Sequence, residues 1–185
     1  RLEATIVEHL GRRQHRAPWL RYEDDPIASS PVVHFEYPSS ERGGFAYLRR
    51  EVKLELGSLT DQRPTEQHAV RAWVVDDFPA AFMDWDCQVT ALELLRTFWE
   101  KATILHAEHH RPNDQPMPDR YARHYSDMAR LLGHANANAM LADHALCARV
   151  VAWKSRVFAR QWARYDLARP GTFRLLPPMA RLPAL

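Results

Sequence analysis

The sequence predicts an α+β protein, with strands gathered in its first half and helices in its second. Short β-branched and aromatic runs occur up to residue 92, separated by turn segments that contain Gly, Pro and Ser. After residue 92, apolar residues recur at steps of three and four, which indicates amphipathic helices. The same change of pattern predicts two domains, residues 1–92 and residues 93–185.

The first half is predicted to contain one helix and a long hairpin. Apolar residues at helical spacing predict a helix within residues 1–15, ended by Gly11. A polar loop follows over residues 22–31. Strand-like runs over 32–37 and 45–56, with a Gly- and Pro-containing turn between them, predict the hairpin.

The second hairpin strand has two different faces, because apolar and charged residues alternate over Val52–Leu56. Lys53 and Glu55 share one face. A single acid on a strand suits a metal ligand in phosphoryl transfer, and it equally suits a solvent-facing side chain of a hairpin. Shorter strands are predicted over 69–75 and 88–92, with loop before the first and an irregular segment between them.

The second half is predicted to hold three helices, over about residues 93–110, 119–132 and 138–163. Prolines end the first helix and Gly133 ends the second. A Pro-rich tail follows residue 170. On the first helix the apolar stripe is predicted from the spacing of Phe98, Ala102 and Leu105, with help from Trp99 and Ile104.

Two polar faces on these helices are candidates for chemistry. Lys101 lies beside the apolar stripe of the first helix, where a lone lysine is usually solvated. The second helix carries cations and an acid on one face, at Arg120, Arg123 and Asp127, with His124 beside them and an apolar face at Tyr121, Tyr125, Met128 and Leu132. Such a face suits an internal salt bridge and equally a phosphate clamp.

Three histidines close the first helix and raise the question of a metal site. His106 and His110 lie four residues apart on one face, as zinc ligands would. Glu108 is one place away from its position in the H-E-x-x-H pattern, and no third ligand follows at a clear spacing. We therefore expect all three, including His109, to lie on a polar helix end, where partial positive charge suits the helix dipole.

Charge is unevenly spread along a chain whose net charge is +2. Residues 136–185 carry eight Lys/Arg and two Asp/Glu. On the third helix a basic stripe includes Trp153 as a stacking surface, which suits RNA, whereas a solvated basic face is the alternative. The stripe consists of Arg149, Arg156, Arg160 and Arg164, with Lys154 near. The opposite stripe, predicted as core, is Leu141, Ala145, Ala148, Val151, Phe158 and Trp162.

The composition excludes several protein classes. Two cysteines, Cys87 and Cys147, are too few for a disulfide scaffold or a zinc cage, which fits a reducing cytoplasm. No apolar run approaches the roughly 20 residues that span a bilayer, and no signal-peptide pattern is present. We expect a cytoplasmic protein without a membrane partner.

Taken in order, four segments resemble the AbiEii-type nucleotidyltransferase toxins of bacterial toxin–antitoxin and phage-abortive systems. The resemblance covers roughly residues 35–178. The segments are Val52-Lys53-Leu54-Glu55, Arg96-Thr97-Phe98-Trp99-Glu100-Lys101-Ala102-Thr103-Ile104-Leu105-His106, Arg120-Tyr121-Ala122-Arg123-His124-Tyr125-Ser126-Asp127-Met128 and Pro170-Gly171-Thr172-Phe173-Arg174-Leu175-Leu176-Pro177-Pro178. The resemblance implies a polymerase-β-like nucleotidyltransferase core with a helical C-terminal part.

The resemblance also implies roles for individual residues. Glu55 matches a late acid of the core sheet that assists a divalent metal, Mg²⁺ or Mn²⁺, and Lys53 matches the basic residue before it. Lys101 matches the helix lysine that contacts the NTP phosphates, and Asp127 matches the essential acid of the next helix. The basic residues around that acid are Arg120 and Arg123. The implied partners are a cognate antitoxin protein and a nucleic acid acceptor, tRNA.

One part of the family pattern, a Gly-Ser turn followed by a strand bearing Asp-x-Asp, is absent. Gly57-Ser58 and Asp84-Trp85-Asp86 are about twice as far apart as the motif requires, so we interpret them as loop residues. We expect the chain to be a fragment, since the motif would precede Arg1, and to be catalytically incomplete. The rival hypothesis is a non-catalytic RNA- or protein-binding module that retains the fold.

Overall fold

We describe the fold from a computed structural model of the chain. It has two compact units, residues 1–60 and 61–185, and each is described by itself. The described residues are 1–13, 18–24, 30–38, 50–57, 61–81, 86–118, 121–179 and 181. None of the helices in these ranges is long and apolar enough to span a bilayer.

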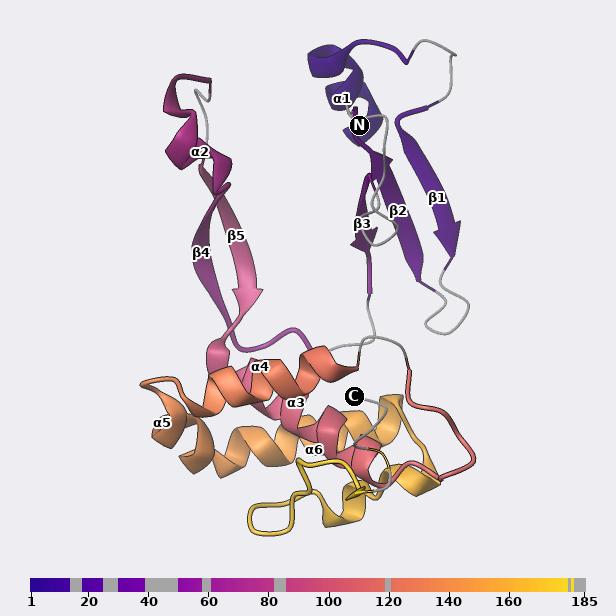
Figure 1. Ribbon diagram of the computed structural model, residues 1–185, viewed down its shortest axis with the longest axis vertical. Helices are drawn as coiled ribbons and strands as arrows, with labels where there is room; N and C mark the ends of the chain where they lie inside the picture. The colour runs from indigo at the N-terminus through magenta and orange to yellow at the C-terminus, as the bar shows by residue number, and fades with distance from the viewer. Residues whose placement is uncertain are drawn as a thin grey trace. The chain divides into compact units, whose positions relative to one another are not determined.

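The first unit contains helix α1 (Leu2–Leu10) and an antiparallel sheet, as Figure 1 shows. The sheet has the order β1-β2-β3, formed by Leu20–Asp24, Pro31–Glu36 and Glu51–Glu55. The pairing of β2 with β3, in which Val33 faces Leu54, confirms the predicted hairpin. The remainder of the predicted hairpin, residues 39–49, lies outside the described residues.

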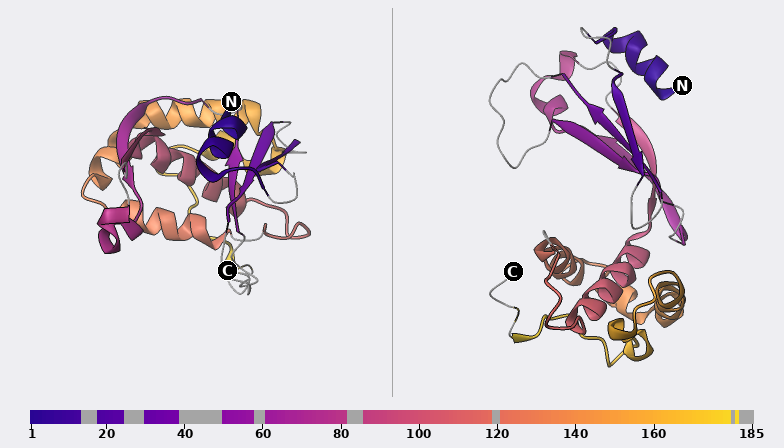
Figure 2. Two further views of the ribbon diagram at one scale, coloured as in Figure 1. Left: turned by 90° about the horizontal axis from the view of Figure 1, so that it is seen from above. Right: turned by 90° about the vertical axis from the view of Figure 1, so that its right-hand side faces the viewer.

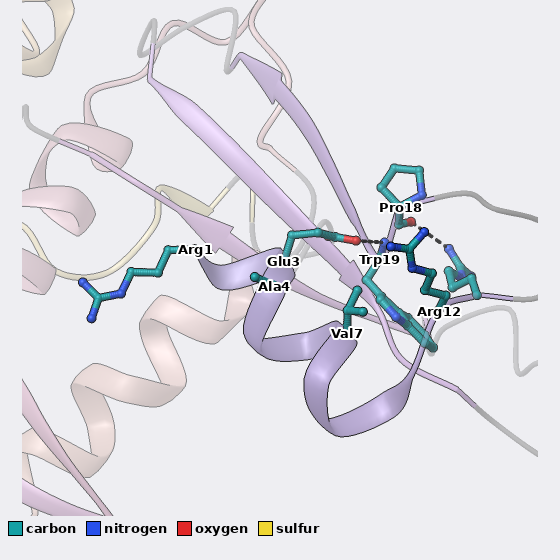
Figure 3. A pocket seen from close by; sticks show the side chains of 8 residues that line it. Arg1, Glu3, Ala4, Val7, Arg12, Pro18 and Trp19 are labelled. Carbon is teal, nitrogen blue, oxygen red and sulfur yellow. Dashed lines mark hydrogen bonds between the residues drawn. The ribbon is translucent and has the colours of Figure 1, made fainter.

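A side chain of helix α1 accepts hydrogen bonds from the backbone at the start of β1. The two carboxylate oxygens of Glu3 accept hydrogen bonds from the backbone amides of Trp19 and Leu20, at 2.8 and 3.0 Å. Figure 3 shows Glu3 reaching from α1 toward Trp19. The Trp19 indole N–H donates to the carbonyl of Gly11, which ends α1 as predicted.

Strand β1 is a correction, because residues 22–31 were predicted as a polar loop. In β1 only Leu20 is buried, and Tyr22, Glu23 and Asp24 are exposed. Apolar and polar residues therefore do not alternate along this strand, and the sequence pattern could not reveal it. The strand is held by pairing with β2 and by His34, which is buried in β2. Its Nε2 lies 2.9 Å from Glu23 and its Nδ1 lies 3.1 Å from Glu51, so one ring bridges both neighbouring strands.

The second unit begins with a two-stranded hairpin, β4 (Thr65–Arg71) and β5 (Asp86–Leu92). The strands pair antiparallel from Thr65 and Leu92 to Arg71 and Asp86. Between them lie the short helix α2 (Val74–Asp77) and a 3₁₀ turn, η1 (Pro79–Ala81). Strand β4 starts and ends earlier than the predicted strand over 69–75. Its start was missed because Thr65-Glu66-Gln67 contains no apolar residue.

Four helices follow, α3 (Leu94–His109), α4 (Ala122–Leu132), α5 (Ala137–Ala142) and α6 (His144–Val157). Helices α4, α5 and α6 all pack against α3 (Figures 1 and 2). Two 3₁₀ turns, η2 (Gln161–Ala163) and η3 (Tyr165–Leu167), lie in the last segment. The core between the helices consists of Phe98, Trp99, Ala102, Leu105, Met128, Leu131, Met140, Leu146, Cys147 and Val150.

The predicted apolar stripe of α3 is confirmed, because Phe98, Ala102 and Leu105 are buried. The predicted third helix is wrong both in its continuity and in the face that it turns to the core. Residues 138–163 are interrupted at Asp143, whose carboxylate accepts a hydrogen bond from the Leu146 amide at 2.9 Å and caps α6. This break rotates the helix faces, so that Leu146, Cys147 and Val150 face the core. The predicted core residues Leu141, Ala145, Ala148 and Phe158 are exposed. On α4, Leu131 replaces the predicted Leu132 in the core.

The chain is therefore an α+β protein, with antiparallel sheets in its first half and helices in its second. The strand-to-helix change at residues 92–94 lies inside the second compact unit rather than between the two units. The predicted domain boundary at 92/93 stays a prediction.

Candidate functional site

Lys101 of α3 meets two side chains of α4. Its Nζ lies 2.7 Å from Oδ2 of Asp127 and 3.1 Å from Nδ1 of His124. Positions 124 and 127 are three apart, so they share one face of α4, and the packing of α4 against α3 turns that face to Lys101. The structure thus brings together Lys101 and Asp127, two of the residues singled out from the sequence, and adds His124 between them.

The protonation of this cluster follows from its charges. A hydrogen bond from Lys101 lowers the pKa of Asp127, which is therefore a carboxylate at neutral pH. Burial, and then the charges of Lys101 and Arg123, lower the pKa of His124. A neutral His124 ring accepts the hydrogen bond from the Lys101 ammonium at Nδ1 and carries its own proton on Nε2.

The cluster is open to solvent on one side. The Lys101 side chain is 22% exposed and that of Asp127 is 40% exposed. An ammonium has three N–H donors. Asp127 and His124 take two of them, so the partly exposed Lys101 retains one donor for an oxygen of a ligand.

A buried charge network lies next to this cluster and was not foreseen from the sequence. Arg96 is fully buried and donates to Glu100 and, at 3.0 Å, to Asp61. The other oxygen of Glu100 pairs with Lys154 at 2.6 Å. Asp61 accepts two hydrogen bonds from Arg149, at 2.7 and 2.8 Å. Burial raises the pKa of Asp61, but the hydrogen bonds from Arg149 and Arg96 outweigh it and lower the pKa overall.

This network fixes the part of α3 that carries Lys101. Lys154 belongs to α6, so its pair with Glu100 ties α6 to the residue that precedes Lys101. It also corrects the predicted basic stripe, because Lys154 is buried and Arg149 is neutralised by Asp61. The signal in the sequence was weak: Arg96 and Glu100 are four apart, which is usual for an exposed helix pair.

Glu55 and Lys53 lie on β3 of the first unit. They share a face of the strand, as predicted, and their side chains pair at 2.6 Å while remaining largely exposed. Glu55 belongs to the first unit and Lys101 to the second, and each unit is described by itself. On α4, Arg123 is exposed. Arg120 lies outside the described residues, as do Ser58, Asp84 and Trp85.

Comparison with protein families decides the identity of the chain. A family model described as the nucleotidyl transferase AbiEii toxin of type IV toxin–antitoxin systems matches residues 3–183. The chain belongs to the AbiEii family. No curated protein and no solved structure matches it.

Membership of the AbiEii family states the class of activity, substrate and partner to which the chain belongs. The family consists of nucleotidyltransferase toxins, so the family fold is that of a nucleotidyltransferase and the substrate class is an NTP. Each toxin of such a system has an antitoxin partner. The resemblance inferred from the sequence segments is confirmed at the level of the family. The roles of the individual residues stay predictions.

The residues of this AbiEii chain can be tested for their fit to a divalent cation. Mg²⁺ is held by oxygen ligands, of which carboxylates are the usual protein contribution. Among the residues that the structure describes, no three His, Cys, Asp or Glu side chains gather into a candidate metal group. Glu55 carries one such carboxylate, which pairs with Lys53 at 2.6 Å. These residues alone do not form a Mg²⁺ site.

The histidines at the end of α3 are structural, which corrects the prediction of a polar helix end. His106 is fully buried; its Nε2 donates to the carbonyl of Arg164 at 2.9 Å and its Nδ1 accepts from the amide of Arg174 at 3.2 Å. Burial lowers the pKa values of His106 and His110, so neither favours the charged form. His109 holds the carbonyl of Leu176 at 2.7 Å. His106 and His109 join the C-terminal segment to α3, and the His110 ring packs against both of them.

A hollow lies beside α1 in the first unit, and three of its lining side chains, those of Glu3, Arg13 and Trp19, make local contacts. Figure 3 shows its lining residues, among them Glu3, Arg12 and Trp19. Glu3 holds backbone amides, and Arg13 pairs with Glu36 at 2.9 Å and stacks on the Trp19 ring. The hollow therefore supports the local fold, and the cluster around Lys101 remains the best candidate site.

Proposed function

We propose that Lys101 is the residue through which this AbiEii chain holds the phosphates of an NTP. The observation that carries the proposal is the contact of a partly exposed ammonium with both Asp127 and His124. Asp127 and His124 hold the long lysine side chain in one orientation, so little rotamer entropy is lost when a phosphate oxygen binds. In this arrangement Asp127 positions Lys101 and Lys101 touches the substrate.

Four further residues have proposed roles that rest on family resemblance. Arg123, exposed on the same helix, adds a second cation near the phosphates, and Arg120 is assigned the same role. Glu55 contributes one carboxylate ligand to Mg²⁺ or Mn²⁺, which would neutralise phosphate charge when bound. Lys53, whose Nζ lies 2.6 Å from Glu55, would orient that carboxylate.

The proposed acceptor is RNA, with tRNA as the specific class, and the proposed location is the cytoplasm, where tRNA and NTPs are found. Exposed arginines of the C-terminal quarter, such as Arg156 and Arg160, support this proposal. The contribution of this segment is smaller than the eight Lys/Arg of residues 136–185 suggest, because four of them pair with carboxylates. These four are Arg149, Lys154, Arg164 and Arg181. Exposed cations provide the sequence-independent part of RNA affinity. Transfer of a nucleotide to tRNA would remove usable tRNA, which accounts for a toxic outcome that an antitoxin counteracts.

The binding step is tested by replacing Lys101. We expect Lys101→Met to weaken NTP binding by about tenfold or more, which is ~1.4 kcal/mol. Lys101→Arg should restore part of the affinity because it keeps the charge. Isothermal titration of each NTP, with and without Mg²⁺, measures the change. Arg160→Met is the matched control, since it also removes one exposed cation of the second unit. Equal losses in Lys101→Met and Arg160→Met would contradict the proposal.

We also propose that this chain alone does not complete the transfer. It contains no Gly-Ser turn closely followed by Asp-x-Asp, and its described residues form no group of three metal ligands. The measurement is transfer of radiolabelled nucleotide from each NTP to total tRNA. Sustained turnover by these 185 residues would overturn this part. RNA binding without any NTP binding would instead favour the rival function, an RNA-binding module that retains the fold.

A further inference from the structure

The far end of the β4–β5 hairpin exposes apolar side chains to an unusual degree. Trp73 is 92% exposed and Phe78 is 61% exposed, with Val74 at 44% beside them. We call Trp73, Val74, Asp76, Asp77 and Phe78 the tip. Exposed apolar groups gathered in one place commonly mark an interaction surface. Tryptophan in particular contributes strongly to binding when it enters a pocket.

The tip is acidic as well as apolar, which decides what kind of surface it fits. Residues 72–86 contain four Asp and no Lys, Arg or His. Arg71 pairs with Asp76 at 2.6 Å, and Asp77 is exposed. An exposed aromatic ring can stack on a nucleobase, but the exposed carboxylate of Asp77 would repel the phosphates of a nucleic acid. The tip therefore fits a protein surface that combines apolar and basic side chains.

The C-terminal segment of the same unit presents such a surface. Leu176 is 77% exposed and Met179 is 81% exposed. Arg169 and Arg174 are exposed in the same segment, and within the described part of the chain neither pairs with a carboxylate. We call Arg169, Arg174, Leu176 and Met179 the C-terminal patch. It is complementary to the tip in charge, and both surfaces carry exposed apolar side chains.

One chain cannot close this contact on itself. The tip lies at the far end of the hairpin from the helices, and the C-terminal segment runs along the opposite side of the helices (Figures 1 and 2). Both surfaces belong to the second unit, so this arrangement lies within one compact unit. A contact between tip and patch must therefore join two chains.

We propose that two copies of this chain form a two-fold dimer in which each tip docks on the partner's C-terminal patch. A two-fold axis makes both contacts at once, so that the assembly closes at two copies. Each contact buries one Trp and one Phe, roughly 300–500 Å² of aromatic side chain. Burial of the tip would also stabilise the two-stranded hairpin, which has few packing contacts of its own. The dimer is independent of the proposed nucleotide binding.

Sedimentation velocity over about 1–200 µM protein tests the dimer. The wild-type chain should shift from monomer to dimer with concentration, and Trp73→Ala should weaken the association by about tenfold or more. Leu10→Ala is the matched control, because Leu10 is an exposed apolar residue of the first unit. Circular dichroism checks that each variant keeps its secondary structure. A wild-type chain that stays monomeric, or that grows beyond the dimer, would overturn the proposal.

An exchange of charges tests the partners directly. Asp77→Arg should abolish association through the tip and Arg174→Glu should abolish it through the patch, each when studied alone. A mixture of these two variants restores opposite charges at both contacts. The mixture should therefore recover a dimer that neither variant forms by itself. Failure of the mixture to associate, while the wild type does, would contradict the pairing of tip with patch.

Discussion

At the scale of single residues, His106 joins parts of the second unit that are distant in sequence. Its two ring nitrogens hold the backbone of Arg164 and Arg174, and its ring packs against Phe173. The hydrogen bond that Nδ1 accepts exists only while the ring is neutral. The charged groups near it are those of His109, His110, Arg174 and Asp166, of which only Asp166 favours protonation.

His106 therefore predicts a loss of stability in mild acid. Burial lowers its pKa in the folded state, whereas the unfolded value is about 6.5. Between these two values the unfolded chain binds more protons, so stability is fully present above pH ~6.5 and falls as the pH drops through the folded pKa. Urea unfolding at about pH 7.5 and pH 5.5 measures the effect.

The matched variant is His106→Gln, which does not titrate. We expect it to be less stable than the wild type at neutral pH, by about 1–3 kcal/mol, because a hydrogen bond at a buried site is lost. Its stability should fall less steeply between the two pH values. Some pH dependence should remain, since burial also lowers the pKa values of His110 and His124. An unchanged pH dependence would refute the assignment to His106.

Single residues also show where reading the sequence succeeds and where it fails. Helix periodicity correctly placed Asp127 on a polar face of one helix and Lys101 beside the apolar stripe of another, because it states which side chains share a face. That the two side chains meet at 2.7 Å is a finding of the structure. Arg96 was not recognised as buried, because an arginine in a helix is usually solvated and its partner Asp61 lies 35 residues away in the sequence. Contacts between distant residues of opposite charge leave no periodic pattern.

At the scale of elements, the C-terminal segment is held to α3 by a buried ion pair. Glu108 is 1% exposed and accepts hydrogen bonds from Arg111 at 2.7 Å and from Arg181 at 3.2 Å. Arg181 also donates to three backbone carbonyls, those of Arg111, Pro112 and Gln115. These carbonyls lie after the end of α3, where no helical N–H is available to bond them. The Arg181 side chain therefore supplies the donors for several backbone acceptors.

Removing Arg181 should leave Glu108 partly unpaired in the interior. We expect Arg181→Ala to lower the free energy of unfolding by about 2–4 kcal/mol, less than a fully broken buried pair because Arg111 remains. Combining it with Glu108→Gln should give a coupling of about 1–3 kcal/mol in a double-mutant cycle. Chemical denaturation of the four proteins measures this coupling, and strictly additive effects would show that the two residues do not interact.

Elements were predicted well wherever apolar residues recur at a regular step along the chain. The β2–β3 hairpin and the start of α3 follow from alternation and from three- and four-residue steps. The division of residues 138–163 into α5 and α6 could not be predicted in the same way, because Asp143 is compatible with a helix interior as well as with a cap. The cap exists because packing on α3 fixes where α6 must begin.

At the scale of the whole molecule, two boundaries compete. The sequence pattern divides the chain at 92/93, and compactness divides it at 60/61. Asp61 lies between the two boundaries, and it pairs with Arg96 of α3 and with Arg149 of α6. A piece that starts at residue 93 contains both arginines and lacks their shared carboxylate. Arg96, which is fully buried, would then keep Glu100 as its remaining acidic partner.

This difference gives a prediction about truncated chains. Residues 61–185 should fold alone with one cooperative thermal transition, because the whole hydrophobic core of the helices belongs to them. Residues 93–185 should be less stable by about 2–4 kcal/mol or more, since a buried cation has lost a partner. Truncation to residues 93–185 removes both the Asp61 carboxylate and the β4–β5 hairpin. Asp61→Asn in residues 61–185 separates these two effects, because it removes only the charge and leaves the hairpin in place. If Asp61→Asn is as stable as its parent while residues 93–185 are not, the hairpin rather than the charge network stabilises the helices.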